Sequence, residues 1–189
     1  RGDRVPRRGP MDLDIVERAV PITERKEKSR KGIYKLKDPF FRFWFRFVFE
    51  NMDYVEQNKQ KNLLQEKIEP ELNAFIGKGF EPVCAEWLAK NPGFKDYLLG
   101  SWWDKGEEID IVGLSKAKKG ALFCECKWKS NVDAKTLLGQ LEEKAQKVDW
   151  FKGERTERYC LFAKSFREKK IAGKNVDLID SKDLEEGFR

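Results

Sequence analysis

The segment "EIDIVGLSKAKKGALFCECKWK", residues 108–129, decides the fold. Two strand-like runs flank the polar loop "SKAKKG", a pattern typical of antiparallel strands joined by a turn. Alternation places Glu125 and Lys127 on one face of the second strand, while the cysteines beside them face the other way. Asp110 lies on the first strand. Because neighbouring strands lie about 4.8 Å apart, we expect Asp110 and Glu125 to converge if the strands diverge or bulge near their ends.

These residue types predict a particular chemistry. Hard cations such as Mg²⁺ bind carboxylate oxygens, and a cation held by Asp110 and Glu125 could bind a phosphate oxygen and lower the pKa of a bound water. Lys127 could then stabilise developing negative charge or position the attacking water. Glu125 and Lys127 could instead form an ordinary exposed pair on an edge strand. The apolar residues around them favour a central strand, buried on both faces, and therefore a functional site.

The composition predicts a globular protein and restricts its chemistry. Apolar residues make up 40% of the 189 and include 14 Phe and 6 Trp, so a core is expected although 38% of the residues are charged. The chain has no His, which excludes Ser-His-Asp and Cys-His catalysis and His-ligated metals. Cys84, Cys124, Cys126 and Cys160 form no C-x-x-C pair, so we expect buried free thiols rather than a zinc cluster or disulfides.

The charge balance leaves two interpretations open. A formal net charge of +6 and a pI of 9.0 permit contact with a phosphate backbone. Abundant Lys and Glu dispersed along the chain are also typical of the surface of a thermophile protein. No segment offers the roughly 20 apolar residues of a membrane helix, and no signal peptide is visible at the start. We therefore expect an intracellular, cytoplasmic protein with no membrane partner.

Residues 1–37 are expected to form a basic arm and a β-hairpin. The arm, "RGDRVPRRGP", is rich in Pro and Gly and has no periodicity. Two strands are predicted in "DIVERAVPIT" and "KGIYKLKD", around the polar loop "ERKEKSRK". A winged-helix domain ends in such a hairpin, so this segment is interpreted as a partial winged helix. The missing initiator Met makes a fragment of a longer chain one explanation of the N-terminal boundary.

Residues 38–76 are expected to form linker helices. "DPFFRFWFRFVFEN" begins with Asp38 as N-cap and Pro39 in the first turn. Its aromatic residues fall all around the helical wheel, which predicts a helix buried on most sides. A base-stacking platform of Phe and Trp beside Arg42 and Arg46 is the functional alternative.

Residues 77–189 are expected to form an α/β domain with a mixed central sheet flanked by helices. Pro70 and the Gly77–Gly79 pair predict a break between two helices, the second running from about Phe80 to Lys90. Three strands should follow as an antiparallel meander, in "KDYLLGSWWD", "EEIDIVGLS" and "ALFCECKWK".

The last third of the chain predicts a crossover. One face of the next helix is apolar, formed by Leu137, Leu138, Leu141, Ala145 and Val148. The strands "ERYCLFAKS" and "KNVDLID" come next, and a terminal helix should be capped by Ser181. A strand reached through a crossover helix implies a mixed sheet.

The order of these elements, with "EIDIV" and then "ECK" on neighbouring strands, resembles the PD-(D/E)XK nuclease superfamily. The resemblance implies a restriction-endonuclease-like fold and a divalent-metal-dependent nuclease, with Mg²⁺ or Mn²⁺ as cofactor and DNA as partner. It assigns Asp110 and Glu125 as metal ligands and Lys127 as the catalytic lysine. The literal Pro-Asp of the superfamily name is absent, because Ile109 precedes Asp110.

The same resemblance assigns two helical residues to the site. Glu81, in "GKGFEPVCAEWL", matches the acidic residue of the superfamily's first helix, and Glu86 competes with it from another helical face. Gln140 matches a polar residue on the helix after the E-x-K strand.

A second resemblance covers most of the chain. "ERAVPIT", "GIYKLKDPFFRFWFRFV", "WWDKGEEIDIV" and "ECKWK" are similar to the C-terminal region of the archaeal ATPase family. This implies a nuclease-like domain, and an ATPase module of the parent chain as partner, since these 189 residues contain no P-loop motif. The alternatives are a catalytically inactive module that binds nucleic acid or protein, and a homodimer formed through the N-terminal segments.

Overall fold

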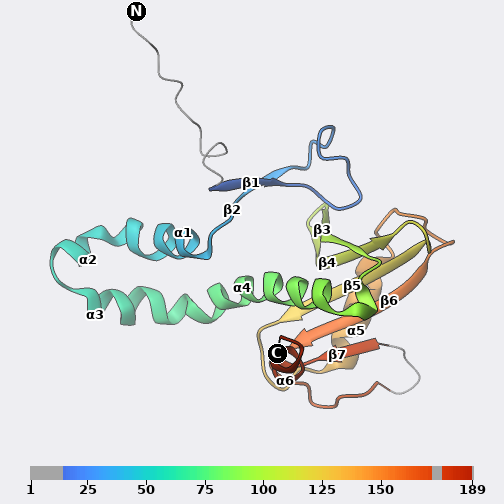
Figure 1. The fold of residues 1–189 in the computed structure, drawn as a ribbon. Helices are drawn as coiled ribbons and strands as arrows, with labels where there is room; N and C mark the ends of the chain where they lie inside the picture. The colour runs from blue at the N-terminus through green and yellow to red at the C-terminus, as the bar shows by residue number, and fades with distance from the viewer. Residues whose placement is uncertain (1–14, 172–175, 189) are drawn as a thin grey trace, which may run out of the picture. The chain divides into compact units, whose positions relative to one another are not determined.

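The computed structural model describes residues 15–171 and 176–188, which form two compact units (Figure 1). Residues 15–20 and 26–75 make up the first, and 21–25 with 76–188 the second. Residues 21–25 belong to the second unit because Ile22 N–H donates to the Ser101 carbonyl at 2.9 Å. The predicted basic arm lies outside the described residues.

The predicted N-terminal hairpin is confirmed. Strands β1 (Val16–Ala19) and β2 (Ile33–Leu36) pair antiparallel. Arg18 on β1 holds the loop between them, because its guanidinium donates to the Lys26 and Ser29 carbonyls at 2.6 Å each. Backbone carbonyls that would otherwise need water are thus paired within the hairpin.

Short helical segments form the rest of the first unit. Their bounds are α1 Pro39–Phe43, a π-helical turn Trp44–Val48, a 3₁₀ turn Phe49–Asn51, α2 Met52–Glu56, α3 Gln60–Leu63 and a second π-helical turn Leu64–Ile68. The predicted cap at Asp38 is confirmed, since its carboxylate accepts from the Phe40 N–H at 2.7 Å.

The sequence predicted that the aromatic helix is buried on most sides, and this prediction is wrong. Phe47 is 2% exposed and packs with Phe75, at 5.4 Å between ring centroids, but Phe40 and Phe49 are 61% and 59% exposed. The rings instead pair along the helix, as Phe45 does with Phe49 at 5.5 Å. Contacts between aromatic residues four apart on one helix cover part of their apolar surface from water without a surrounding core.

The predicted break near Pro70 is also wrong, because α4 runs without interruption from Glu69 to Lys90. Pro70 lies in the first turn of α4, directly after the wider π-helical turn, where a missing N–H is tolerated. Gly77 and Gly79 remain helical although each glycine costs about 1 kcal/mol. Burial of four apolar side chains of this helix outweighs that cost: Phe80, Cys84, Trp87 and Leu88. No helix within 15–171 and 176–188 is long and apolar enough to cross a membrane.

A five-stranded mixed sheet forms the second unit, in the order β3-β4-β5-β6-β7. The strands are β3 Leu98–Asp104, β4 Glu107–Ser115, β5 Gly120–Lys127, β6 Thr156–Ala163 and β7 Val176–Ile179. The predicted antiparallel meander of β3, β4 and β5 is confirmed, and β6 and β7 are added in parallel. Lys105 and Gly106 join β3 to β4 with positive φ angles of 47° and 86°, which favour glycine at the second position. The strand that carries Glu125 is therefore central.

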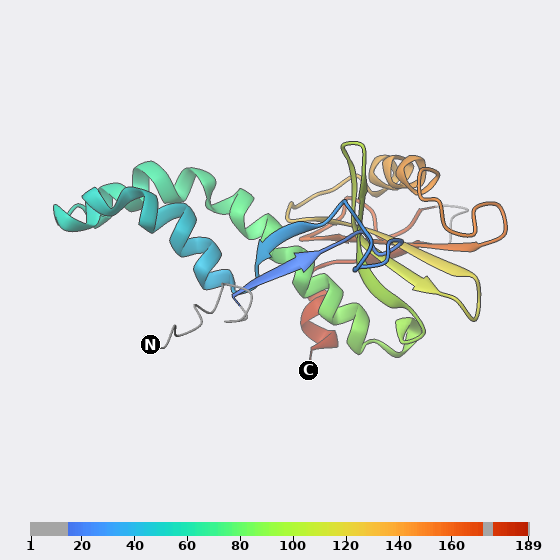
Figure 2. The same ribbon diagram turned by 90° about the horizontal axis from the view of Figure 1, so that it is seen from above.

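Helices cover both faces of this sheet (Figures 1 and 2). Helix α5 (Ala134–Ala145) packs on one face through its predicted apolar stripe, against Val112, Phe123 and Leu161. The C-terminal half of α4 packs on the other face, against Ile111 and Phe162. All four cysteines are buried free thiols on that second face, as predicted. A short 3₁₀ turn, Pro92–Phe94, follows α4.

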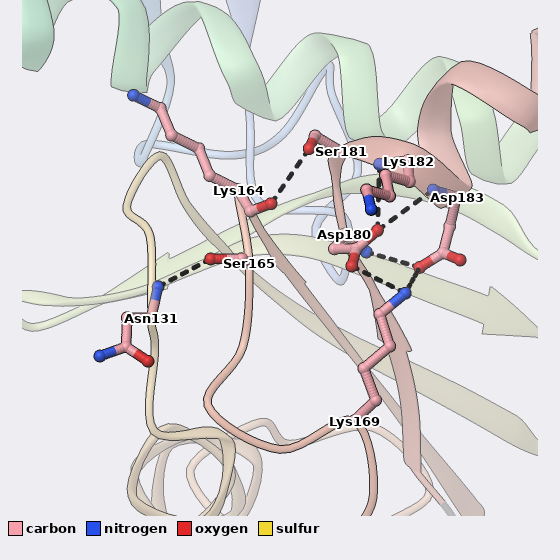
Figure 3. A network of polar contacts seen from close by, with 8 residues as sticks. All are labelled: Asn131, Lys164, Ser165, Lys169, Asp180, Ser181, Lys182 and Asp183. Atoms are coloured by element: carbon pink, nitrogen blue, oxygen red, sulfur yellow. Dashed lines mark hydrogen bonds and ion pairs between the residues drawn. The ribbon is translucent and has the colours of Figure 1, made fainter.

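The C-terminal helix α6 (Ser181–Gly187) is capped by Asp180 (Figure 3). The sequence had predicted Ser181 as the cap, and this prediction is wrong. The Asp180 carboxylate accepts from the N–H groups of Lys182 and Asp183, and Lys169 Nζ lies 2.7 Å from it. Ser181 instead donates its hydroxyl to the Lys164 carbonyl at 3.1 Å. Asp180 takes the cap because its ionised carboxylate, with the Lys169 ammonium beside it, accepts backbone N–H groups more strongly than a neutral hydroxyl does.

Asp180→Ala is expected to lower the free energy of unfolding by about 1 kcal/mol, the usual cost of losing an N-cap. Burial raises the pKa of Asp180, but Lys169 and the Asp183 N–H outweigh it and hold the pKa below its ordinary 3.8. The stabilisation is therefore present above pH 4 and is lost as the pH falls through the folded-state pKa. Urea unfolding at pH 7 and below pH 3 tests this: an equal loss at both would contradict it, and Lys182→Ala is the neutral control.

Candidate active site

Strands β4 and β5 part where the site begins. Their ladder runs from Ser115 opposite Gly120 to Ile111 opposite Cys124. The next pair would place Asp110 opposite Glu125, but there the Asp110 carboxylate itself accepts the Cys126 N–H at 2.8 Å. A side chain thus replaces a backbone acceptor, and both acidic residues lie where the strands stop pairing.

The Glu125 carboxylate is the centre of the site. Its side chain is only 5% exposed, yet two ammonium groups reach it. Lys127 Nζ lies 2.6 Å from Oε1, while Lys144 Nζ lies 3.2 Å from Oε1 and 3.0 Å from Oε2. A buried carboxylate needs such partners, because leaving it unpaired away from water costs several kcal/mol.

Asp110 is the second acidic group of the site, and its surroundings disfavour its charge. Burial raises the pKa of Asp110 above its ordinary value, and the nearby Glu125 charge raises it further. The Cys126 N–H and the ammonium groups of Lys127 and Lys144 oppose this rise. A carboxyl whose pKa is raised by burial and by a second acid gains from a further cation nearby.

Lys127 remains an ammonium at neutral pH. Partial burial lowers the pKa of Lys127, but the hydrogen bond to Glu125 and the charges of Glu125 and Asp110 more than compensate, so the pKa lies above its ordinary value. Its side chain is 45% exposed, in contrast to that of Glu125. The group therefore offers a fixed positive charge at the open side of the site, and is unsuited to act as a base.

The structure brings Asp110, Glu125 and Lys127 together, while the assignments of Glu81 and Gln140 to the site stay predictions. Glu81 lies on α4, whose C-terminal half packs on the opposite sheet face from α5. Gln140 is exposed on α5. The competing candidate, Glu86, forms a surface pair with Lys90 at 2.7 Å.

Lys144 was missed from the sequence, although α5 carries a signal for it. Leu137, Leu141 and Val148 mark an apolar stripe, and Lys144 falls within it at the position where the spacing calls for another apolar residue. It also lies one helical turn after Gln140, on the same side of α5. The pairing with Glu125 depends on how α5 crosses β5, which the periodicity does not specify.

Both ends of α5 are anchored, which places Lys144. Asp133 caps the start of the helix by accepting the Thr136 N–H at 3.0 Å. At the other end, Arg155 donates to the carbonyls of Ala145 at 2.7 Å and Val148 at 2.6 Å. Carbonyls at a helix C-terminus have no partner within the helix, and a cation there also favours the helix dipole.

The loops that follow β5 and β6 are tied together beside the site (Figure 3). Asn131 N–H donates to the Ser165 hydroxyl at 2.9 Å. Trp128 packs with the Phe80 ring at 5.1 Å and the Lys164 ammonium at 4.2 Å. Trp128 is thus engaged in packing within the second unit.

The carboxylates of Asp110 and Glu125 are suitable ligands for a hard cation that takes few of its ligands from the protein. Mg²⁺ is commonly held by one or two carboxylates and keeps several waters, so Asp110 and Glu125 suffice in kind. Among the residues that the structure describes, no three His, Cys, Asp or Glu side chains gather in a way that could hold a metal ion. A cation here would therefore depend on water or on a ligand for most of its coordination.

Comparison with known proteins places the chain in a family. Residues 44–147 match the model of DUF234, described as archaea bacterial proteins of unknown function. The chain belongs to this family. The matched range contains α4, the β3-β4-β5 meander and α5, and with them Asp110, Glu125, Lys127 and Lys144.

A curated relative extends this result. "Uncharacterized protein MJECL04" of Methanocaldococcus jannaschii is 38% identical over 146 residues, which cover 73% of this chain and 32% of that protein. The chain thus spans about a third of the length of its relative. No solved structure matches the chain.

Proposed function

We propose that the second unit is a divalent-metal-dependent nuclease domain of the PD-(D/E)XK type, acting on DNA phosphodiesters. One observation carries the proposal. Asp110 and Glu125 emerge from neighbouring strands exactly where the ladder ends, and Lys127 lies on the same side of β5 as Glu125, 2.6 Å from it. Two converging carboxylates and an ammonium are the groups that metal-assisted phosphodiester hydrolysis needs.

Each residue has a role that its surroundings support. Asp110 and Glu125 would hold the cation, which when bound would polarise a phosphate oxygen and activate a water. Lys127, protonated and 45% exposed, would stabilise the negative charge that develops on the phosphate. Arg155 and Asp133 hold α5 in place, and the Ser181 hydroxyl anchors the Lys164 carbonyl directly after β6, so the residues around the reaction stay fixed.

A role within a larger protein forms part of this proposal. The chain spans 32% of its archaeal relative, which leaves room there for another domain. We propose an ATPase module of the archaeal ATPase family as that domain, on the basis of the sequence motifs quoted above. The net charge of +6 supports DNA as the partner.

A second candidate is an inactive module that binds nucleic acid or protein. The observation that favours it is the complete pairing of Glu125, because two ammonium groups already neutralise the charge that a cation would need. Under this alternative, the site residues would serve stability alone.

Cleavage of labelled single-stranded, duplex and branched DNA distinguishes the two candidates. With Mg²⁺ or Mn²⁺, the wild-type protein is expected to cut at least one of these DNAs, and an excess of EDTA should stop the reaction. Asp110→Ala, purified in the same way, should leave no cleavage above background, because it removes one of the two cation ligands.

Two results would contradict the nuclease proposal. Cleavage that persists in Asp110→Ala would point to a contaminating enzyme. DNA binding without cleavage of any substrate, equal in both proteins, would favour the inactive module. Circular dichroism of Asp110→Ala serves as the control for folding.

A further inference from the structure

The Lys144 ammonium lies where a cation would be expected. Its distances of 3.0 and 3.2 Å to the two oxygens of Glu125 are nearly equal, so it lies close to the bisector of the carboxylate. Lys127 takes a second position on Oε1. A carboxylate offers about four lone-pair positions, and three of those on Glu125 accept an ammonium hydrogen. With 5% of its side chain exposed, Glu125 has little room for a further partner.

The charges of the site also indicate that the Lys144 ammonium occupies the position of a cation. Asp110 and Glu125 contribute two negative charges, and Lys127 and Lys144 contribute two positive charges, so the group is formally neutral. A divalent cation entering between the two carboxylates would meet the Lys144 ammonium at close range. Like charges that close, away from bulk water, repel strongly. Both groups can hardly occupy Glu125 at once.

We propose that Lys144 and a divalent cation compete for Glu125, so that Lys144 holds the cation's position in the free protein and must leave it when the cation binds. The inference rests on the proposed function for the two ligands, Asp110 and Glu125. Lys144 would then be a positioning residue that keeps Glu125 in place and weakens cation binding. Lys144 lies in the last turn of α5, and its side chain is 25% exposed. The ammonium can therefore swing into solvent while the aliphatic stem stays packed.

Titration with Mn²⁺, followed by the loss of its free-ion electron paramagnetic resonance signal, tests this directly. Lys144→Met removes the competing charge and keeps the packing of the stem, so it should bind Mn²⁺ at least about tenfold more tightly than wild type. Lys147→Met is the matched control. Lys147 lies three residues later and pairs with Glu107 at 2.6 Å, so its loss changes the net charge equally and should leave Mn²⁺ affinity within about twofold.

The outcomes separate this inference from the proposed function. If wild type and Lys144→Met bind Mn²⁺ equally, and Asp110→Ala abolishes binding, the site stands and the competition is overturned. If neither protein binds Mn²⁺, the metal site itself fails, and the inference fails with it. Equal tightening in Lys147→Met would show an effect of net charge alone and would also overturn the competition.

A measurement on the wild-type protein covers the case in which Lys144→Met does not fold. Lysines react with an N-hydroxysuccinimide ester when their amine is free, and mass spectrometry reports each site. Competition predicts that Mn²⁺ increases labelling of Lys144 severalfold and leaves Lys147 unchanged. Unaltered labelling of Lys144 at an Mn²⁺ concentration that saturates binding would overturn the proposal.

Discussion

Lys127→Met is expected to slow DNA cleavage by a factor of about 10² to 10³, the usual cost of removing one group that stabilises transition-state charge. Lys127 is the ammonium of the site that is both fixed to Glu125, at 2.6 Å, and 45% open to solvent. Methionine preserves most of the length of the side chain. The change should therefore appear in the rate of cleavage rather than in the affinity for DNA, measured by single-turnover kinetics and by fluorescence anisotropy.

Lys129→Met provides the control for this prediction. Lys129 is exposed two residues further along the same segment, and its backbone carbonyl accepts the Lys164 N–H at 3.1 Å whatever its side chain. Its substitution removes the same charge and should change the rate by less than about threefold. Equal rates for both variants and wild type would rule out a catalytic role for Lys127.

Arg155→Met should lower the free energy of unfolding by about 3–5 kcal/mol, as breaking buried charged hydrogen bonds does. The Arg155 side chain is 2% exposed. It donates to the carbonyls of Ala145, Val148 and Trp150 and pairs with Glu157 at 2.8 Å. Methionine fills the space but leaves these acceptors without a donor, and each unsatisfied buried acceptor costs about 1–3 kcal/mol.

Arg167→Met is the matched comparison for urea unfolding. Arg167 is 62% exposed and lies 3.8 Å from Asp133, so its loss should cost less than about 0.5 kcal/mol. A loss below about 1 kcal/mol for Arg155→Met would mean that water replaces the guanidinium, and that α5 does not depend on it.

Features that follow from local periodicity could be predicted from the sequence. Alternation placed Glu125 and Lys127 on one face of their strand, the apolar residues around them indicated a central strand, and the apolar stripe of α5 located that helix. The contacts that decide the site are of another kind. Lys144 reaches Glu125 from nineteen residues away because of the angle at which α5 crosses the sheet, and local pattern contains no information on that angle.

The errors have a similar origin. Pro70 and Gly79 suggested a break in α4, but the propensity of single residues is small beside the burial of a whole apolar helix face. The exposure of Phe40 and Phe49 was missed because an aromatic-rich segment has the same composition in a core as in a helix that pairs its own rings.

The four cysteines give the second unit a further property, indifference to redox conditions. All four are buried beneath α4, and burial raises the pKa of Cys126 and Cys160 well above the ordinary value. The thiolate is the form that oxidants and alkylating agents attack. Burial shields all four thiols from such reagents, so a cysteine introduced on the surface of the folded unit would be modified well before them.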